Sequence, residues 1–207
     1  MYLFFRRLLS IVFHIKYHIT LHHEENLSGL TGGYIIASNH LTMLDPPMIA
    51  SCVQGKFSFM AKEELFHKNP FVTFIITRCG AFPVVRGSGD GEPIEKAVEV
   101  LGKNRIFVIF PEGTRSKDGR IGRVKSGVAL IAGQASAPVL PVCLKYSGKR
   151  DVDVSFGKLI PAEELRIDGD DRKALRNVSK RIRTDMVALW EELNPDPAEE
   201  DREDVKD

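Results

Sequence analysis

Short apolar runs alternate along the chain with longer stretches of helical periodicity. The runs that predict strands cover residues 34–38, 57–61, 81–85, 106–110, 139–144 and 151–156. Apolar positions repeating every three or four residues predict helices that begin at residue 45 and cover 63–77, 92–101, 128–135 and 171–193. Pro70 is expected to break or kink the helix over 63–77. This alternation predicts a single α/β domain whose twisted, mostly parallel sheet is flanked by helices.

The N-terminal twenty residues form a pattern of their own. The stretch is apolar but is interrupted by Arg6, Arg7 and Lys16, so no run reaches the roughly 18 uncharged residues of a membrane-spanning helix. On a helical wheel the apolar residues share one broad face and the polar residues the other, with Lys16 alone among the apolar group. This predicts an amphipathic helix over residues 1–20 that lies in a membrane interface. The alternative is an amphipathic helix packed on the protein's own core.

Composition and charge narrow the class of protein. The 207 residues are 43% hydrophobic and 28% charged, which is typical of a globular domain, here expected over residues 21–193. The net charge of +1 hides an acidic tail over residues 194–207, expected to be solvated and mobile. Without the tail the body is basic, which suits an anionic membrane or a phosphate-bearing substrate. The cysteines, Cys52, Cys79 and Cys143, are widely spaced and are expected to be reduced thiols of a cytosolic protein.

A first polar cluster follows the first predicted strand, with Asn39 and His40 in the turn and Asp45 at the start of the next helix. Histidine is the usual general base near neutral pH, and a neighbouring carboxylate can fix its tautomer and stabilise the imidazolium. The structural alternative makes Asp45 a helix N-cap and His40 an ordinary loop residue. A His-x4-Asp pair alone decides little between the two, since it recurs by chance.

A second cluster leaves the most apolar strand at its carboxyl end, where residues 110–116 read Phe-Pro-Glu-Gly-Thr-Arg-Ser. Glu112 and Arg115, held by a turn that contains glycine, are well placed to bind a polar ligand. Further cations follow at positions 117, 120, 123 and 125, and such a stretch can hold a phosphate through charge-assisted hydrogen bonds. The alternative is a solvated loop with an internal Glu112–Arg115 pair.

Other charged residues also follow predicted strands. Arg86 comes directly after the third strand, and Lys62 and Glu64 follow the second. Each has an ordinary explanation, as a surface arginine or as helix-capping charges. If the strands are parallel, however, all these clusters converge on the carboxyl edge of the sheet, where ligands usually bind in α/β folds. We therefore expect one site at this edge.

Several common signatures are absent from the sequence. There is no Gly-x-Ser-x-Gly elbow of a serine hydrolase. Residues 87–91 have the wrong spacing for a dinucleotide loop, and residues 123–126 lack the glycines of a P-loop. The run His22-His23-Glu24-Glu25 has no second histidine at zincin spacing. We expect neither a metal site nor a cofactor.

Motif blocks between residues 34 and 146 resemble, in the same order, those of the 1-acylglycerol-3-phosphate acyltransferase (lysophosphatidate acyltransferase) family. The blocks are Asn39-His40-x4-Asp45, residues 80–86 (Gly-Ala-Phe-Pro-Val-Val-Arg), residues 110–116 and Val139-Leu140-Pro141-Val142. Residues 60–65 (Met-Ala-Lys-Glu-Glu-Leu) match a further segment common in the family. One block is easily accidental, whereas the ordered set is not.

The resemblance implies a role for each matched residue. His40 would deprotonate the acceptor hydroxyl, and Asp45 would orient His40. The residues that would hold the glycerol phosphate are Arg86, Glu112, Gly113, Thr114 and Arg115. Lys125 and Gly127 resemble the family's Lys-x-Gly, with Val124 in place of a frequent Phe, and Lys125 would contact the phosphate. Because a thioester is already activated, base catalysis and positioning would supply most of the rate.

The reaction implied by the resemblance moves a fatty acyl group from an acyl-carrier-protein (acyl-ACP) or coenzyme A (acyl-CoA) thioester to the 2-hydroxyl of lysophosphatidate. The product would be phosphatidate, made in phospholipid biosynthesis at the cytoplasmic face of the cell membrane. The expected partners are these substrates, an anionic membrane surface and acyl carrier protein, but no nucleic acid. Alternatives are another lysolipid or glycerol-3-phosphate as acceptor, a thioesterase that uses water, and a non-catalytic peripheral lipid-binding module.

Overall fold

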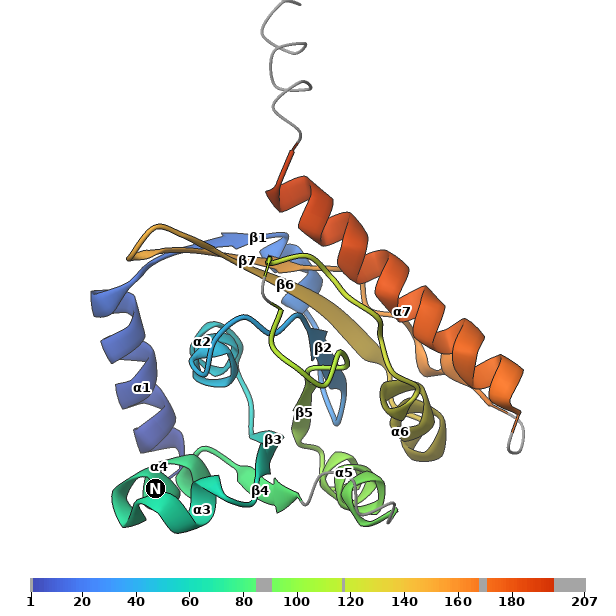
Figure 1. Ribbon diagram of the computed structural model, residues 1–207, viewed down its shortest axis with the longest axis horizontal. Helices are drawn as coiled ribbons and strands as arrows, with labels where there is room; N and C mark the ends of the chain where they lie inside the picture. The colour runs from blue at the N-terminus through green and yellow to red at the C-terminus, as the bar shows by residue number, and fades with distance from the viewer. Residues whose placement is uncertain (1, 85–90, 117, 168–170, 196–207) are drawn as a thin grey trace, which may run out of the picture.

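One twisted sheet organises the molecule (Figure 1). The computed structural model describes residues 2–84, 91–116, 118–167 and 171–195 of the chain. In these residues the strands are β1 (His18–His22), β2 (Ile35–Ser38), β3 (Phe57–Lys62), β4 (Ala81–Val84), β5 (Ile106–Ile109), β6 (Val139–Ser147) and β7 (Asp151–Phe156). Their order across the sheet is β1-β7-β6-β2-β5-β3-β4.

The strands from β2 to β6 all run parallel, and among the described strand pairs only β6–β7 is antiparallel. The edge strand β1 then runs parallel to β7. The predicted α/β fold with a mostly parallel sheet is therefore confirmed. Because β2 lies between β5 and β6, the loops that follow these three strands are neighbours at the carboxyl edge of the sheet.

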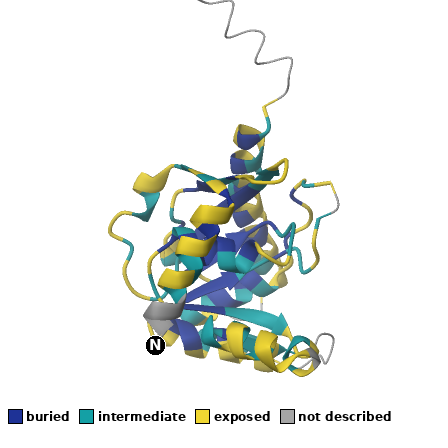
Figure 2. Ribbon diagram, turned by 90° about the vertical axis from the view of Figure 1, so that its left-hand side faces the viewer, coloured by how far each residue is buried: buried dark blue, intermediate teal, exposed yellow. Residues whose placement is uncertain are grey.

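Helices cover both faces of the sheet. On one face lie α5 (Glu92–Gly102), α6 (Gly127–Ala135) and α7 (Arg172–Leu193), and on the other lie α1 (Tyr2–Lys16) and α2 (Asp45–Cys52) (Figure 1). Successive residues of β2 enter the two cores in turn, with Ile35 and Ala37 on the α7 side and Ile36 on the α2 side. Burial on both faces explains why the central strands are continuous apolar runs. Figure 2 shows these buried strands behind the exposed outer surface of α1.

Shorter elements complete the chain: α3 (Leu65–Lys68), α4 (Pro70–Arg78) and the 3-10 helices η1 (Glu24–Leu27) and η2 (Ala162–Leu165). The predicted break before Pro70 is confirmed, since α3 and α4 are separated at Asn69. The Asn69 side chain caps α4 by accepting from the backbone N–H groups of Phe71 and Val72. The Asn69 cap and Pro70 at the first helical position together begin α4 as a separate helix.

The N-terminal helix is shorter than predicted. The extent of residues 1–20 is wrong, because α1 ends at Lys16 and His18–His22 form β1. The backbone of β1 pairs with β7 from His18 opposite Asp151 to His22 opposite Ser155, which satisfies donors and acceptors that β7 would otherwise expose. The expected acidic tail lies almost wholly in residues 196–207, outside the described residues.

Candidate functional site

His40 and Asp45 meet at the carboxyl end of β2. The Nδ1 atom of His40 lies 2.7 Å from Oδ2 of Asp45. The His40 side chain is 19% exposed, and that of Asp45 is fully buried. A carboxylate only accepts hydrogen bonds, so this contact places the proton on Nδ1 and leaves the lone pair of Nε2 to receive another. The pair therefore has the geometry of an oriented general base.

Asp45 is held by hydrogen bonds to both of its carboxylate oxygens. Besides His40, Oδ2 accepts from the backbone N–H groups of Leu41 and Thr42 at 2.6 and 2.8 Å. Oδ1 accepts from the hydroxyls of Thr42 and Tyr146, each at 2.9 Å. Burial pushes the pKa of Asp45 upward, but the hydrogen bonds from His40, Thr42 and Leu41 together bring that pKa below its usual value. The carboxylate is thus kept charged and immobile.

Two contacts from neighbouring strands fix the turn that carries His40. The buried side chain of Asn39 accepts from the backbone N–H of Leu144 and donates to its carbonyl, both at 2.8 Å, and so extends the pairing of β2 with β6. On the other side, Phe110 stacks on the His40 ring with centroids 4.2 Å apart. Because β6 and β5 both flank β2, the fold itself aligns the imidazole.

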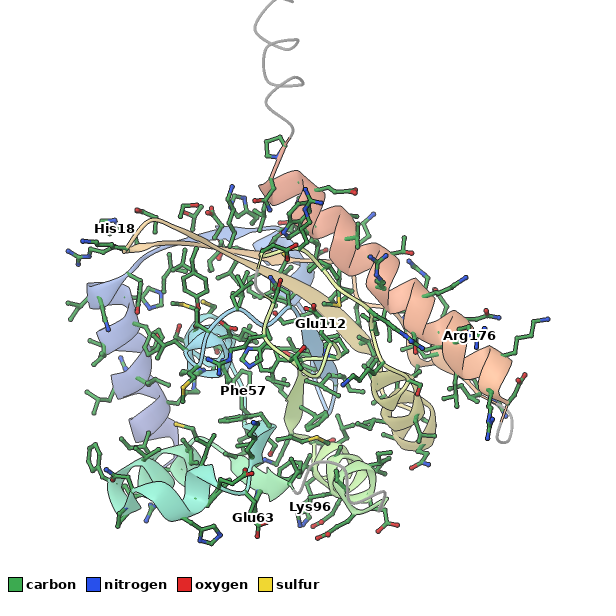
Figure 3. All side chains as sticks on the ribbon, viewed as in Figure 1. His18, Phe57, Glu63, Lys96, Glu112 and Arg176 are labelled. Carbon is green, nitrogen blue, oxygen red and sulfur yellow. The ribbon has the colours of Figure 1, made fainter. Side chains whose placement is uncertain are left out.

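Glu112 begins the second part of the site, in the loop after β5 near the centre of Figure 3. Its Oε2 accepts from the backbone N–H of Gly122 at 2.9 Å, whereas its Oε1 is buried without a hydrogen-bond partner among the described residues. Burial raises the pKa of Glu112 against the lowering effects of the Gly122 N–H and of His40. An orphan buried acceptor of this kind is available to a donor from a ligand.

Two basic side chains help to line a pocket beside Glu112. The pocket has a volume of about 480 Å³, and the residues that line it are Glu112, Thr114, Gly122, Arg123, Lys125 and Ser126. The Lys125 N–H donates to the carbonyl of Pro111 at 2.9 Å, which folds the loop back on itself. Arg183 of α7 donates to the carbonyl of Gly122 and anchors the far side of the loop. Two cations together with the hydroxyls of Thr114 and Ser126 suit an anionic oxygen ligand.

Gly113 allows Lys125 to reach this position. Its backbone has a positive φ of 77°, and a Cβ atom there would lie 2.4 Å from Nζ of Lys125. A side chain at position 113 would therefore be strained and would displace the lysine. The loop of Glu112 also joins that of His40, since the Ser116 N–H donates to the His40 carbonyl at 2.7 Å.

The structure brings most of the predicted site residues together, although their roles stay predictions. The residues found at this edge are His40, Asp45, Glu112, Gly113, Thr114 and Lys125. Arg115 is exposed and does not line the pocket. Arg86 lies outside the described residues.

Tyr146 and Arg123 were not predicted from the sequence as site residues, although the structure places both at the site. Tyr146 is a single tyrosine at the polar end of a strand, and its contact with Asp45 spans 101 positions of sequence, so no local pattern marks it. Arg123 was one cation among several in a run, and only the fold of the loop places it, and not Arg120, at the pocket.

Comparison with known proteins agrees with this arrangement. A family model described as Acyltransferase matches residues 18–145, which begin at β1 and include His40, Asp45 and the pocket beside Glu112. The chain is 31% identical over 142 residues to the chloroplastic 1-acyl-sn-glycerol-3-phosphate acyltransferase LPAT1 of Arabidopsis thaliana. That alignment covers 68% of this chain but only 39% of the plant protein.

A bacterial relative and a solved structure match over more of their length. The 1-acyl-sn-glycerol-3-phosphate acyltransferase of Bacillus subtilis is 29% identical over 80% of this chain and 82% of its own. The crystal structure of the 1-acyl-sn-glycerophosphate acyltransferase PlsC from Thermotoga maritima superposes with a TM-score of 0.71 at 23% identity. The superposition covers 93% of this chain and 80% of the Thermotoga maritima chain, so the two proteins have the same fold. From the family model and the ordered motifs, this chain belongs to the acyltransferase family.

Proposed function

We propose that the protein transfers a fatty acyl group from a thioester to the 2-hydroxyl of a lysophosphatidate and so makes phosphatidate for phospholipid synthesis. The observation that carries this proposal is the meeting of an oriented His40–Asp45 pair with a cationic pocket at one edge of the sheet. The named relatives act, by their descriptions, on 1-acyl-sn-glycerol-3-phosphate, an acceptor with one free hydroxyl and one phosphate. Both groups find matching chemistry in this chain.

In the proposed reaction Nε2 of His40 takes the proton of the acceptor hydroxyl while the hydroxyl oxygen attacks the carbonyl carbon of the thioester. The C–S bond then breaks, the new ester remains, and the proton on His40 passes to the departing thiolate. Asp45 holds the Nδ1 proton and stabilises the imidazolium between the two steps. Since the thioester is already activated, the reaction needs no covalent enzyme intermediate.

The acceptor phosphate is proposed to occupy the pocket beside Glu112. Lys125 and Arg123 would pair with its oxygens, and Thr114 would donate from its hydroxyl. The orphan Oε1 of Glu112 would accept a hydrogen bond from a protonated oxygen of that phosphate, because the one free hydroxyl of the acceptor gives its proton to His40. This contact would satisfy an acceptor that has no partner among the described residues. Arg86 and Arg115 keep their proposed role as further phosphate ligands, supported by the motif match.

We propose a peripheral position on the cytoplasmic face of an anionic membrane, with α1 in the interface. In the described part of the chain, no helix combines the length and apolarity needed to cross a bilayer. One side of α1 packs on the protein, where Arg6 donates to the carbonyl of Val53 and Ser10 to that of Ser51. Its opposite side exposes apolar residues to a lipid surface. The acyl donor is acyl-ACP or acyl-CoA.

A panel of acceptors and donors tests this function. Purified protein is given lysophosphatidate, other lysolipids and glycerol-3-phosphate, each with acyl-CoA and with acyl-ACP, and the products are identified by mass spectrometry. We expect phosphatidate as the main product. A faster reaction with a phosphate-free lysolipid would reassign the acceptor, and products from none of the pairs would favour the lipid-binding module.

A further inference from the structure

Exposed apolar side chains gather in three segments of the protein. Among the described residues, the large apolar side chains that are exposed are Leu8, Ile11, Val12 and Ile15 of α1, Met43 and Leu44 after His40, and Phe71, Val72, Phe74 and Ile75 of α4. Scattered single residues of this kind are normal on a protein surface, but concentration in a few segments marks an interaction surface. We call this set the apolar surface.

In α1 the exposed residues form a continuous stripe. Leu8, Ile11, Val12 and Ile15 are spaced i, i+3, i+4 and i+7, and so they share one side of the helix. The opposite side is the one that packs, since Phe13 is buried in the core beside α2. The exposed stripe is therefore distinct from the face that holds the helix on the domain.

The helix α4 repeats this arrangement in the middle of the chain. Phe71, Phe74, Ile75 and Arg78 again have the spacing i, i+3, i+4 and i+7, and Phe71 is 70% exposed. None of the residues of α4 is buried, although most are apolar. A helix of this composition normally turns its apolar stripe to a core. Here the stripe faces outward.

Two of the three segments of the apolar surface, α1 and α4, adjoin one another. The end of α4 lies beside the start of α1, where a small crevice is lined by Arg6 and Leu9 of α1 and by Arg78 and Cys79 (Figure 1). Met43, which is 64% exposed, belongs to the turn between His40 and Asp45. This third segment of the apolar surface therefore borders the candidate site.

The charges around the surface favour an anionic bilayer as its partner. Neither α1 nor α4 contains an acidic residue. On a helical wheel Arg7 and His14 fall on one margin of the α1 stripe and Lys16 on the other, as in helices that lie among lipid phosphates. The guanidinium of Arg78 lies 4.8 Å from the ring centroid of Phe74, which joins a cation to the exposed aromatic of α4.

We propose that α4 is a second membrane-contacting element, so that the protein docks through α1, α4 and the Met43–Leu44 turn together. This inference deepens the proposed function and rests on its membrane association. Contacts on two separate helices fix the orientation of the domain, which one helix alone leaves free to swing. The docked protein then presents the turn of His40 to the bilayer, from which an amphiphilic acceptor reaches the site without crossing water.

Sedimentation with vesicles tests the role of α4. The double variant Phe71→Ser/Phe74→Ser is compared with wild type, with the α1 variant Ile11→Ser/Ile15→Ser and with the control Thr77→Ser on an exposed polar position of α4. The vesicles contain phosphatidylcholine with and without phosphatidylglycerol. We expect both double variants to bind the anionic vesicles about tenfold more weakly and the control to bind like wild type.

The outcomes separate the two proposals. If the α1 variant loses binding while the α4 variant binds like wild type, the role of α4 is overturned and the membrane association stands. If wild type does not bind the vesicles, both the membrane association and the role of α4 are contradicted. A dimer in light scattering that Phe71→Ser/Phe74→Ser abolishes, with unchanged vesicle binding, would assign α4 to a second copy of the chain.

A tryptophan introduced into α4 provides a second measurement that does not depend on loss of binding. In Phe71→Trp, vesicles should shift the tryptophan emission to shorter wavelength relative to wild type, whose only tryptophan is Trp190 of α7. If adding vesicles shifts the emission wavelength of Phe71→Trp no more than that of wild type, contact between α4 and lipid is contradicted.

Discussion

Two carboxylates at the same edge of the sheet are held in opposite ways. Asp45 is fully buried, and both of its oxygens accept hydrogen bonds, from His40, Leu41, Thr42 and Tyr146. Glu112 accepts one hydrogen bond on Oε2, while its buried Oε1 has no partner among the described residues. The pKa of Asp45 is lowered and that of Glu112 is raised.

The difference separates a carboxylate whose hydrogen bonds are complete within the protein, Asp45, from one that still has an acceptor for a ligand, Glu112. A carboxylate with all its donors in place keeps its charge and its orientation, as a group that aligns an imidazole must. A buried acceptor without a partner costs about 1–3 kcal/mol, which a donor on a bound substrate can recover. The dyad region should therefore control the chemical step, and the Glu112 pocket should control acceptor binding.

The largest effect is expected from His40→Ala. Loss of the general base should lower kcat by roughly 10²–10⁴-fold, because no other group takes the hydroxyl proton. The fold should stay intact, because Asp45 loses the hydrogen bond from His40 but keeps those from Leu41, Thr42 and Tyr146. Steady-state acyl transfer and thermal unfolding measure the two effects. His67→Ala is the matched control, because His67 is 74% exposed and lies on α3. Equal rates in both variants would contradict the mechanism.

Asp45→Asn should lower kcat by about 100-fold and also destabilise the fold. An amide offers one acceptor oxygen where the carboxylate offered two, so a donor near Oδ1 or Oδ2 is left unpaired at about 2 kcal/mol. Because the folded pKa of Asp45 is lowered, its stabilising contribution is complete above the ordinary value of 3.8 and is lost as the pH falls through the folded value.

Urea unfolding at several pH values checks this effect on stability. The difference in free energy of unfolding between wild type and Asp45→Asn should be constant near neutral pH and should shrink as the pH falls below 3.8. A difference that grows on acidification would mean that Asp45 is not held as the charged carboxylate.

Lys125→Ala should affect acceptor binding in the pocket beside Glu112 and not the chemical step. Loss of one charge-assisted hydrogen bond to the acceptor phosphate should raise the KM for lysophosphatidate about tenfold and leave kcat within a few-fold. Lys96→Ala, an exposed lysine of α5, is the control (Figure 3). If Lys125→Ala lowers kcat and leaves KM unchanged, the division between a chemical region and a binding region fails.

The smallest effect is expected from Tyr146→Phe. This change removes the hydroxyl that donates to Oδ1 of Asp45 but keeps the hydrogen bonds that reach Oδ2. The carboxylate should stay in place with less restraint, and kcat should fall about three- to tenfold with KM unchanged. Full activity would show that Thr42 alone is enough to hold Oδ1 of Asp45.

Sequence predicted what depends on local pattern. The strand β2, the turn and the start of α2 are contiguous, so the contact of His40 with Asp45 follows from one strand-to-helix connection. The parallel order of the strands then placed Glu112 beside it, because β5 is the neighbour of β2. Both inferences rest on periodicity and on the geometry of parallel sheets.

The remainder depends on tertiary contacts that no local pattern encodes. Tyr146 meets Asp45 only because β6 pairs with β2, and β6 extends further than its apolar run. The strand β1 was hidden because Ile19 also fits the apolar face of the preceding helix, and only pairing with β7 selects the extended form. The exposure of the apolar stripe of α4 likewise could not be predicted, because it depends on which side of this helix the rest of the protein leaves uncovered.

Paired detection of both products in one reaction tests the central claim most directly. Thiol release from the thioester and phosphatidate formation are followed together, with and without lysophosphatidate. The account predicts that the two products form in equal amounts and that both depend on the acceptor. Thiol released at the same rate without lysophosphatidate, with free fatty acid as the product, would contradict acyl transfer and identify a thioesterase.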